Sequence, residues 1–410
     1  MTAIAEQTGA WLESFTGQRR AEPWLQELRE AAFQRFAQLG FPTTHDEDWR
    51  FTSVAAIART RFGLPNPNWK IEPGDLPTMF FNGRPATAGL PKGVRLATRE
   101  EMEAHLARHA SYQDGAFVAL NTAFLDEIVA LRIERGAVIE EPLHILYGGP
   151  AASAPPVAVH PRTLILAGEN SQCAIVEQYV SGTGAYLTNA VTELAVGDGA
   201  VVDHYKIQTE GAEAFHIGAM FASLGRSANF TTCSIALGGA LARNDVTATL
   251  SEGTEATLNG LYVAGGSQHV DNHTTIDHAK PHGSSRELYK GILDGKAHAV
   301  FNGRILVRKD AQKTDSKQTN KNLVLSDDAT IDTKPELQIF ADDVRCTHGA
   351  TIGQLDAESL FYLQSRGIGR SDARKLLTYA FAQDIVDRIK VPSLRDSLER
   401  TLFEKFHERS

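Results

Sequence analysis

A loose repeat of short strands and turns occupies the middle of the chain and most constrains how it can fold. Each unit opens on an apolar residue, passes through a turn-forming cluster and a small residue, and ends in alternating apolar positions. The units begin at Val196, Leu224, Leu250, Leu293 and Leu325. The first spacings are 28 and 26 residues, whereas the later spacings of 43 and 32 residues would need insertions. A unit of this length made of strands and turns predicts a β-solenoid, whose stacked coils bury one continuous core.

The alternative architecture for this region is a β-sandwich. Its strands recur about every 8 to 12 residues, which leaves the longer repeat unexplained. We therefore predict a mainly β protein whose core is a β-solenoid over residues 136–356. The terminal coils of a solenoid expose strand edges, which have to be capped or paired.

Helical regions are expected on both sides of this core. In the N-terminal region, residues 1–60, apolar side chains recur every three or four positions and stop before Gly40 and Pro42, as in an amphipathic helix. Residues 61–135 are assigned to a mixed connecting segment. The N-terminal apolar stripe comprises Trp24, Leu25, Leu28, Ala32, Phe36 and Leu39.

The C-terminal region, residues 357–410, is also expected to be helical. Ser371 is a plausible N-cap for its main helix, and Pro392 ends the run. The apolar positions between them recur at helical spacing, which predicts one apolar face. This face comprises Ala373, Leu376, Leu377, Ala380, Phe381, Ile385 and Ile389.

Composition argues against several classes of protein. The 410-residue chain has a formal net charge of −9 with both signs spread along it, unlike a protein that binds nucleic acid or an anionic membrane. Its three cysteines, Cys173, Cys233 and Cys346, fit a reducing cytosol better than a disulfide framework. The N-terminus lacks the pattern of a secretory signal, and no apolar run is long enough to span a membrane. We expect a cytoplasmic protein.

Four histidines in the stretch SQHVDNHTTIDHAKPHG form one candidate metal site. They are His269, His273, His278 and His282, with Asp271 and Asp277 between them. Imidazole and carboxylate groups are common ligands of zinc and related metals. However, residues five apart on a regular strand face opposite sides, which would separate His273 from His278. The alternative is a polar corner of the solenoid, where these side chains form hydrogen bonds with turn backbone.

The stretch VRCTHGATIGQLD carries a second candidate pair, Cys346 and His348. Two residues apart on a strand, they should project to the same side. Two ligands are too few for a closed zinc or iron site, which takes four. If metal binds here, the other ligands come from elsewhere, for example from another chain. The alternative is structural, because a buried cysteine commonly serves as a small apolar side chain.

The chain resembles the SufB/SufD family of iron–sulfur cluster assembly proteins. The resemblance is carried by FNGRILVRKDAQKTDSKQTNKNLVLSDDATIDTKPELQIFADDVRCTHGATIGQLDAESLFYLQSRGI, Phe301 to Ile368, and by HVDNHTTIDHAKPHGSSRELYKGIL and GFPTTHDEDWRFTS. Within the family it looks like SufD rather than SufB. Gly349 follows the histidine, as in SufD sequences, and the N-terminal cysteine cluster of many SufB members is missing.

The resemblance implies a right-handed parallel β-helix flanked by helical segments, and a scaffold subunit rather than an enzyme. It also implies a complex with SufB and the ATPase SufC, in which an iron–sulfur cluster is held transiently. Reduced flavin is a candidate electron source for such an assembly.

The resemblance also suggests roles for particular residues. His348 matches the SufD histidine thought to lie at the interface with SufB and to help hold the nascent cluster, and Cys346 matches a neighbouring cysteine. The C-terminal helices match the region that docks SufC. The residues assigned to this docking face are Leu376, Leu377, Ala380, Phe381 and Ile385.

Two other functions remain as alternatives. The first is a β-helix carbohydrate-active enzyme, which would use carboxylates on the solenoid face. Its candidate residues are Glu177, Glu193, Asp203 and Asp245, although no pair stands at a fixed spacing. The second is a SufD-like homodimer without a metal role.

Overall fold

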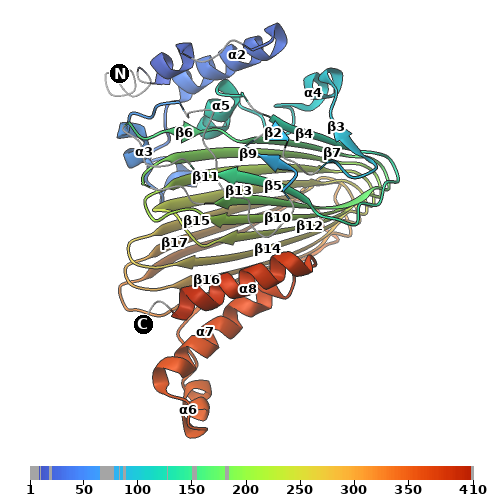
Figure 1. The fold of residues 1–410 in the computed structure, drawn as a ribbon. Helices are drawn as coiled ribbons and strands as arrows, with labels where there is room; N and C mark the ends of the chain where they lie inside the picture. Colours follow the sequence, from blue (N-terminus) through green and yellow to red (C-terminus); the bar gives the residue numbers. More distant parts are fainter. Residues whose placement is uncertain are drawn as a thin grey trace.

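Two facing sheets, wound from one set of stacked coils, form the body of the molecule (Figure 1). The chain alternates between the sheets, so strands of successive coils pair in parallel. The outermost strand at the N-terminal end of each sheet pairs antiparallel instead. The β-solenoid predicted from the repeat and the parallel strands implied by the resemblance are therefore confirmed, with about seven turns. The structure is a computed structural model that describes residues 9, 11–17, 21–64, 78–82, 84–85, 89–126, 128–149, 155–180 and 184–407.

The two sheets have continuous strand orders along the solenoid. The first sheet runs β2-β1-β5-β8-β10-β12-β14-β16-β18-β20, and the second runs β19-β17-β15-β13-β11-β9-β7-β4-β3, with β6 beside β9. Strands of the first sheet are β1 Phe80–Phe81, β2 Arg84–Pro85, β5 Leu143–Gly148, β8 Gln172–Val180, β10 Val201–Thr209, β12 Asn229–Ala236, β14 Glu255–Ala264, β16 Ser284–Leu293, β18 Asp315–Val324 and β20 Arg345–Gly353. Strands of the second sheet are β3 Val94–Leu96, β4 Ile128–Ile133, β6 Ala158–Val159, β7 Arg162–Ala167, β9 Leu187–Val196, β11 Phe215–Leu224, β13 Leu241–Leu250, β15 His269–His278, β17 His298–Val307 and β19 Thr330–Ile339.

The uneven spacing of the sequence repeat has a simple structural cause. Val196, Leu224 and Leu250 each end a strand of the second sheet, so their spacings measure whole coils. Leu293 instead ends β16 of the first sheet, and Leu325 directly follows β18 of the same sheet. The expected insertion between Leu250 and Leu293 was therefore wrong. Leu250 ends β13 and Leu293 ends β16, so the 43 residues between them span one and a half coils, from one edge of the solenoid to the other.

Alternation along each strand divides its side chains between the interior and an outer layer. On β10, Val202 belongs to the interior core, whereas Tyr205 packs with the C-terminal helices. Inside, large and small residues occupy neighbouring coils. A Cβ atom on Gly260 would lie 2.2 Å from the ring of Tyr289, which is the register partner of that glycine. Such complementary volumes let the coils stack at close-packed density.

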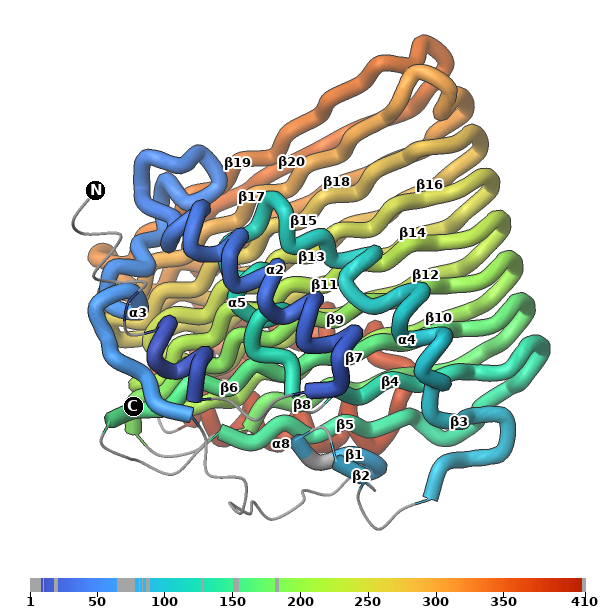
Figure 2. Tube along the Cα trace, turned by 90° about the horizontal axis from the view of Figure 1, so that it is seen from above, coloured from blue at the N-terminus to red at the C-terminus, as the bar shows by residue number. Residues whose placement is uncertain are grey.

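N-terminal helices cover the outer face of the second sheet (Figure 2). Their bounds are α2 Pro23–Leu39, η1 Glu47–Trp49, α3 Ala55–Arg59, α4 Arg99–His105 and α5 Ala116–Ala123. Phe33 and Phe36 of α2 share an apolar cluster with Leu187 and Ile217, which point outward from β9 and β11. The amphipathic helix predicted before Gly40 is confirmed as α2, and its apolar stripe docks the N-terminal region on the solenoid.

Three helices form the described C-terminal region, and the last two of them cover the outer face of the first sheet. They are α6 Ala357–Ser365, α7 Arg370–Val386 and α8 Pro392–His407. Ile385 of α7 and Leu398 of α8 pack against outward side chains such as Tyr205 and Leu261. Among the described residues, no helix combines the length and apolar character needed to cross a membrane.

Candidate functional site

The last coil of the solenoid leaves both sheets open at one end. β20 terminates the first sheet and β19 terminates the second, so each pairs with a neighbour along one edge in the described chain. The side chains of β20 are almost all exposed, in contrast to those of β18 beneath it. An uncovered strand edge carries unpaired N–H and C=O groups that can accept a further strand. We refer to β19, β20 and their exposed side chains as the open end.

Cys346 and His348 both lie on β20 at this open end. Their register partners on β18 are the buried residues Ser316 and Gln318. Both therefore project to the same side, as predicted, and the structure shows that this is the interior side of the last coil. Cys346 is half-buried against Leu337 and its neighbours. His348 is exposed. The structure thus brings the two predicted residues together on one side, with the imidazole reachable from outside.

The local environment distinguishes the chemistry of the two side chains. Partial burial raises the pKa of the Cys346 thiol, so this group remains protonated at neutral pH and must lose a proton to bind a metal. A neutral imidazole can bind metal through its unprotonated nitrogen. His348 can therefore bind a metal ion without losing a proton, whereas binding by Cys346 requires its thiol to be deprotonated first.

Two buried polar residues stand directly behind His348. Glu287 of β16 and Gln318 of β18 occupy the same interior row, and Gln318 Nε2 donates a hydrogen bond of 2.6 Å to Glu287 Oε2. Burial raises the pKa of Glu287 to about 7. Sequence reasoning missed both residues, because a polar residue on a strand is ordinarily assigned to the solvent side. The one sequence feature that could have identified them is their spacing, because Glu287, Gln318 and His348 follow one another at about one coil.

Exposed apolar side chains surround the open end. Ile352 on β20 is 54% exposed, and Phe340, directly after β19, is 64% exposed. Ile339, the last residue of β19, is also exposed. Apolar groups beside an unpaired strand edge are typical of a surface that another protein covers.

The four clustered histidines do not converge on one point. His278 lies inside the solenoid, where its Nε2 is 2.9 Å from Ser285 Oγ and burial lowers the pKa of the ring to about 4. His282 occupies a turn with φ of +63°. His269 and His273 point outward from β15. The predicted separation of His273 from His278 is therefore confirmed.

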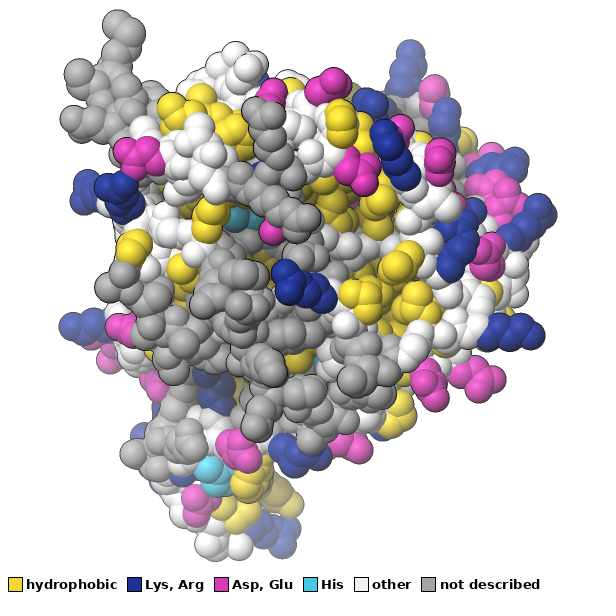
Figure 3. Space-filling view, turned by 45° about the horizontal axis from the view of Figure 1, so that its top comes forward, with side chains coloured by type: hydrophobic (Ala, Val, Ile, Leu, Met, Phe, Trp, Pro, Cys, Tyr) yellow, Lys and Arg dark blue, Asp and Glu magenta, His cyan; other side chains and the backbone are white. Residues whose placement is uncertain are grey.

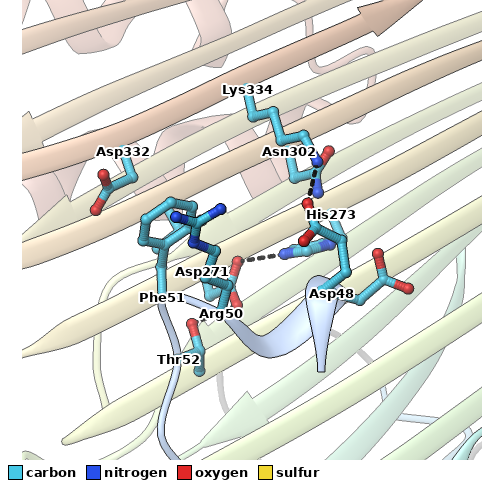
Figure 4. Close-up of a pocket in the computed structure, with 11 residues that line it drawn as sticks. Asp48, Arg50, Phe51, Thr52, Asp271, His273, Asn302, Asp332 and Lys334 are labelled. Atoms are coloured by element: carbon cyan, nitrogen blue, oxygen red, sulfur yellow. Dashed lines mark hydrogen bonds and ion pairs between the residues drawn. The ribbon is translucent and has the colours of Figure 1, made fainter. Parts of the chain in front are cut away.

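Asp271, between the two outward histidines, contacts Thr52, Arg243 and His273; Thr52 and His273 are labelled in Figure 4. Thr52 Oγ1 donates to Asp271 Oδ2 over 2.6 Å, and Arg243 Nη1 donates to the same oxygen over 2.7 Å. His273 Nε2 lies 3.0 Å from the other oxygen, Oδ1. Burial favours the neutral acid, but Arg243 and His273 outweigh it and hold the pKa of Asp271 well below its usual range. Through Thr52, the contacts of Asp271 hold the segment before α3 against the solenoid. In the described part of the chain, no group of three or more histidine, cysteine or acidic residues is placed to hold a metal ion.

The predicted docking face on the C-terminal helices is divided by the structure. Leu376 is 50% exposed and Ala380 is also exposed, whereas Leu377 is half-buried. Phe381 lies under the ammonium of Lys290, 4.1 Å from it, and Ile385 is buried against the solenoid. On α6, which projects away from the body (Figure 1), Phe361 and Tyr362 are 73% and 57% exposed.

The four carboxylates considered for a carbohydrate-active enzyme lie in separate surroundings. Glu177 is inside the solenoid, where Thr163 and His204 contact it. Glu193 is paired with buried Arg162 beneath the N-terminal helices. Each of the other two is held by a basic partner on an outer face. These pairs are Asp203 with Lys390 on the first sheet and Asp245 with Arg243 on the second.

Charged side chains of both signs are interspersed over the face shown in Figure 3. This distribution agrees with the net charge of −9 and with the expectation drawn from composition. The candidate contact surfaces are the open end, with its apolar side chains, and the exposed apolar residues of α6 and α7.

Comparison with known proteins places the chain in a family. Residues 150–381 match the family model for the SUF system FeS cluster assembly, SufBD core domain, and residues 16–76 match the SufBD protein N-terminal region. An iron–sulfur cluster assembly SufBD family protein of Synechocystis is 34% identical, with 91% of this chain and 89% of that protein covered. The iron–sulfur cluster assembly protein SufD of Escherichia coli is 29% identical, with 89% of each covered. A SufBD family protein of Mycobacterium tuberculosis is 33% identical, with 87% of each covered.

Proposed function

Because the chain belongs to the SufBD family of iron–sulfur cluster assembly proteins, we propose that it acts as a SufD-like scaffold subunit in a complex with SufB-like and SufC-like proteins. In this complex a nascent cluster is cargo, held between the open end and the SufB-like subunit. The setting is cytoplasmic, and the ATP-driven step belongs to the SufC-like ATPase rather than to this chain.

The incomplete ligand set at the open end is the observation that carries this proposal. Cys346 and His348 offer two ligands on one side of the terminal strand, whereas a cluster takes four. The same strand has an unpaired edge and an exposed apolar neighbour, Ile352. A partner solenoid that pairs with this edge supplies both the missing ligands and the missing hydrogen bonds.

Within the shared site, His348 is the ligand that faces the partner. Its ring is exposed, whereas Cys346 is partly covered by Leu337. Because the pKa of Cys346 is raised, cluster binding through its sulfur releases a proton. Cys346 accordingly contributes when a metal ion displaces that proton to a neighbouring base or to water.

The SufC-like ATPase docks on the exposed apolar residues of α6 and α7. Leu376, Leu377 and Ala380 provide the contact on α7, and Phe361 and Tyr362 extend it on α6. Phe381 and Ile385, which the sequence also assigned to this docking face, instead pack beneath it. Phe381 faces Lys290, and Ile385 faces the solenoid. Movement of the ATPase would then be transmitted through α7 and α8 to the solenoid.

Anaerobic coexpression with both partners tests the proposal. His348→Ala is expected to lower the yield of cluster on the purified complex several-fold, measured by absorption spectroscopy and iron content. Thr347→Ala is the matched control, since it truncates the adjacent side chain on the opposite side of β20. Equal cluster yields in wild type and His348→Ala, with the complex intact, would remove His348 from the mechanism.

Homodimerisation is the second candidate, and the same open end favours it when no SufB-like subunit is present. Two copies would cover each other's strand edges in the same way. Sedimentation of the isolated chain distinguishes a dimer from a monomer, and displacement by the SufB-like subunit shows whether both use one surface.

A further inference from the structure

An unpaired amide oxygen lies directly behind His348. Gln318 is 1% exposed, and its Oε1 has no hydrogen-bond partner, although its Nε2 donates to Glu287. A buried acceptor without a donor is costly, so such an atom in a packed interior calls for an explanation. Gln318 is also the direct register partner of His348 on the neighbouring strand.

Packing and hydrogen bonding fix the direction of the Gln318 amide. Glu287 accepts the hydrogen bond from Nε2, so the NH₂ group faces β16 and the carbonyl oxygen is left for another partner. Across the interior, a Cβ atom on Gly303 would lie 2.2 Å from Nε2, which shows how closely the amide fills its space. An amide whose Nε2 donates to a carboxyl group and packs closely against Gly303 has little freedom to turn.

The His348 side chain, on the adjacent strand in register with Gln318, can present a donor to this oxygen. Neighbouring strands are about 4.8 Å apart, a gap that a glutamine and a histidine side chain easily bridge. A neutral imidazole has one N–H donor and one unprotonated nitrogen. No hydrogen bond joins the two side chains in the structure, but the His348 side chain is exposed and so has room to turn toward Gln318.

We propose that Gln318 is a positioning residue, whose Oε1 accepts a hydrogen bond from one ring nitrogen of His348. The bond fixes the tautomer and turns the other, unprotonated nitrogen outward at the open end. Histidines that bind metals usually donate their second nitrogen to a carbonyl or carboxylate in this way. The inference rests on the proposed function for its purpose, since it concerns how His348 is presented to cargo. Its geometry can be tested without any partner.

Histidine-selective ¹⁵N labelling of the full chain tests this geometry. The His348 signals are assigned by their loss in His348→Gln, and their shifts above the ring pKa report the tautomer ratio. In wild type we expect one dominant tautomer. In Gln318→Met, which keeps the side-chain length, the ratio should change about threefold or more, toward that of the exposed His45 in the same spectrum. Lys317→Gln, on the outer side of β18, should leave it unchanged.

A paired exchange shows whether the hydrogen-bond arrangement, rather than packing, is responsible. In the double variant Glu287→Gln/Gln318→Glu, the amide on β16 can donate to the carboxylate on β18, whose second oxygen again faces His348. This variant should restore the dominant tautomer lost in Gln318→Met. A wild-type ratio equal to that of His45, or one unchanged in a folded Gln318→Met chain, would overturn the proposal.

Cluster yield in the three-subunit complex separates this proposal from the function on which it rests. If His348→Ala lowers the yield while Gln318→Met changes neither yield nor tautomer, the positioning role fails and the scaffold function stands. If His348→Ala leaves the yield unchanged while Gln318→Met shifts the tautomer, the hydrogen bond stands and the proposed ligand role of His348 fails.

Discussion

Glu287 makes the folded chain sensitive to pH at the scale of a single residue. Burial raises the pKa of this carboxyl from 4.5 to about 7, whereas in the unfolded chain it ionises normally. The stability that depends on its neutral form is fully present below pH 4.5 and is lost as the pH rises to 7. Glu287→Gln removes this dependence. It should raise the free energy of unfolding at pH 8 by about 2–3 kcal/mol, with a smaller gain toward pH 5.

Denaturant unfolding at both pH values measures this effect. Glu213→Gln is the control, because that carboxylate is exposed in the turn between β10 and β11. An equal change in stability at pH 5 and pH 8 would mean that Glu287 titrates normally in the folded chain.

The same residue shows where sequence reasoning ends. The positions of Cys346 and His348 on one side of a strand followed from strand geometry alone. The inward direction of Glu287 and Gln318 did not, because the same alternation allows two opposite assignments of a strand's faces. Which face is buried depends on the facing sheet and on whether it leaves room for the side chain. Gly303, for example, has no side chain and so leaves room for Gln318, and this is apparent only in the three-dimensional structure.

At the scale of elements, the segment from Glu47 to Thr52 binds several coils of the second sheet. Arg243 is central to this contact, since its guanidinium stacks 3.7 Å from the centre of the Trp49 ring and donates to Asp271. Lys334 forms an ion pair with Glu47 over 2.6 Å, which extends the contact to β19. The N-terminal region therefore stabilises the coils nearest the open end, far along the chain.

Arg243→Met should therefore destabilise the protein strongly. The change leaves Asp271 buried without its main countercharge, and breaking a buried pair typically costs about 3–5 kcal/mol. Arg226→Met, which removes an exposed pair with Asp198 at a turn, is the matched control and should have a small effect. Thermal unfolding of both variants measures the difference. Similar losses in the two would show that the buried contact does not hold the coils.

Contacts of this kind could not be derived from the sequence. The helices and the solenoid were predictable because each carries a periodic apolar pattern, at spacings of three and four in α2 and of about one coil in the strands. The contact between Trp49 and Arg243 joins residues nearly two hundred positions apart through one ring and one guanidinium, and no periodicity marks it. The predicted repeat was also shifted by half a coil from Leu293 onward. The turns after strands of the first sheet and those after strands of the second sheet have similar compositions, so the sequence does not distinguish them.

At the scale of the whole molecule, two contact surfaces belong to different structural layers. The open end, with Ile352, is the last coil of the solenoid, whereas Leu376 lies on α7, outside the first sheet. Both side chains are at least half exposed, so a charge at either position leaves the core intact. Ile352→Glu should weaken binding of the SufB-like subunit, because a carboxylate buried in an interface loses its hydration.

Leu376→Glu should act on the other surface and weaken binding of the SufC-like ATPase. Each variant should lower affinity for its own partner at least tenfold and leave the other affinity within about twofold, because the substituted positions share no contacts. Pull-down and calorimetry with separately purified partners measure both affinities, and circular dichroism confirms the fold. Should Leu376→Glu release the SufB-like subunit instead, the assignment of the two surfaces would be reversed. Should either folded variant lose both partners, the surfaces would be coupled through the solenoid rather than independent.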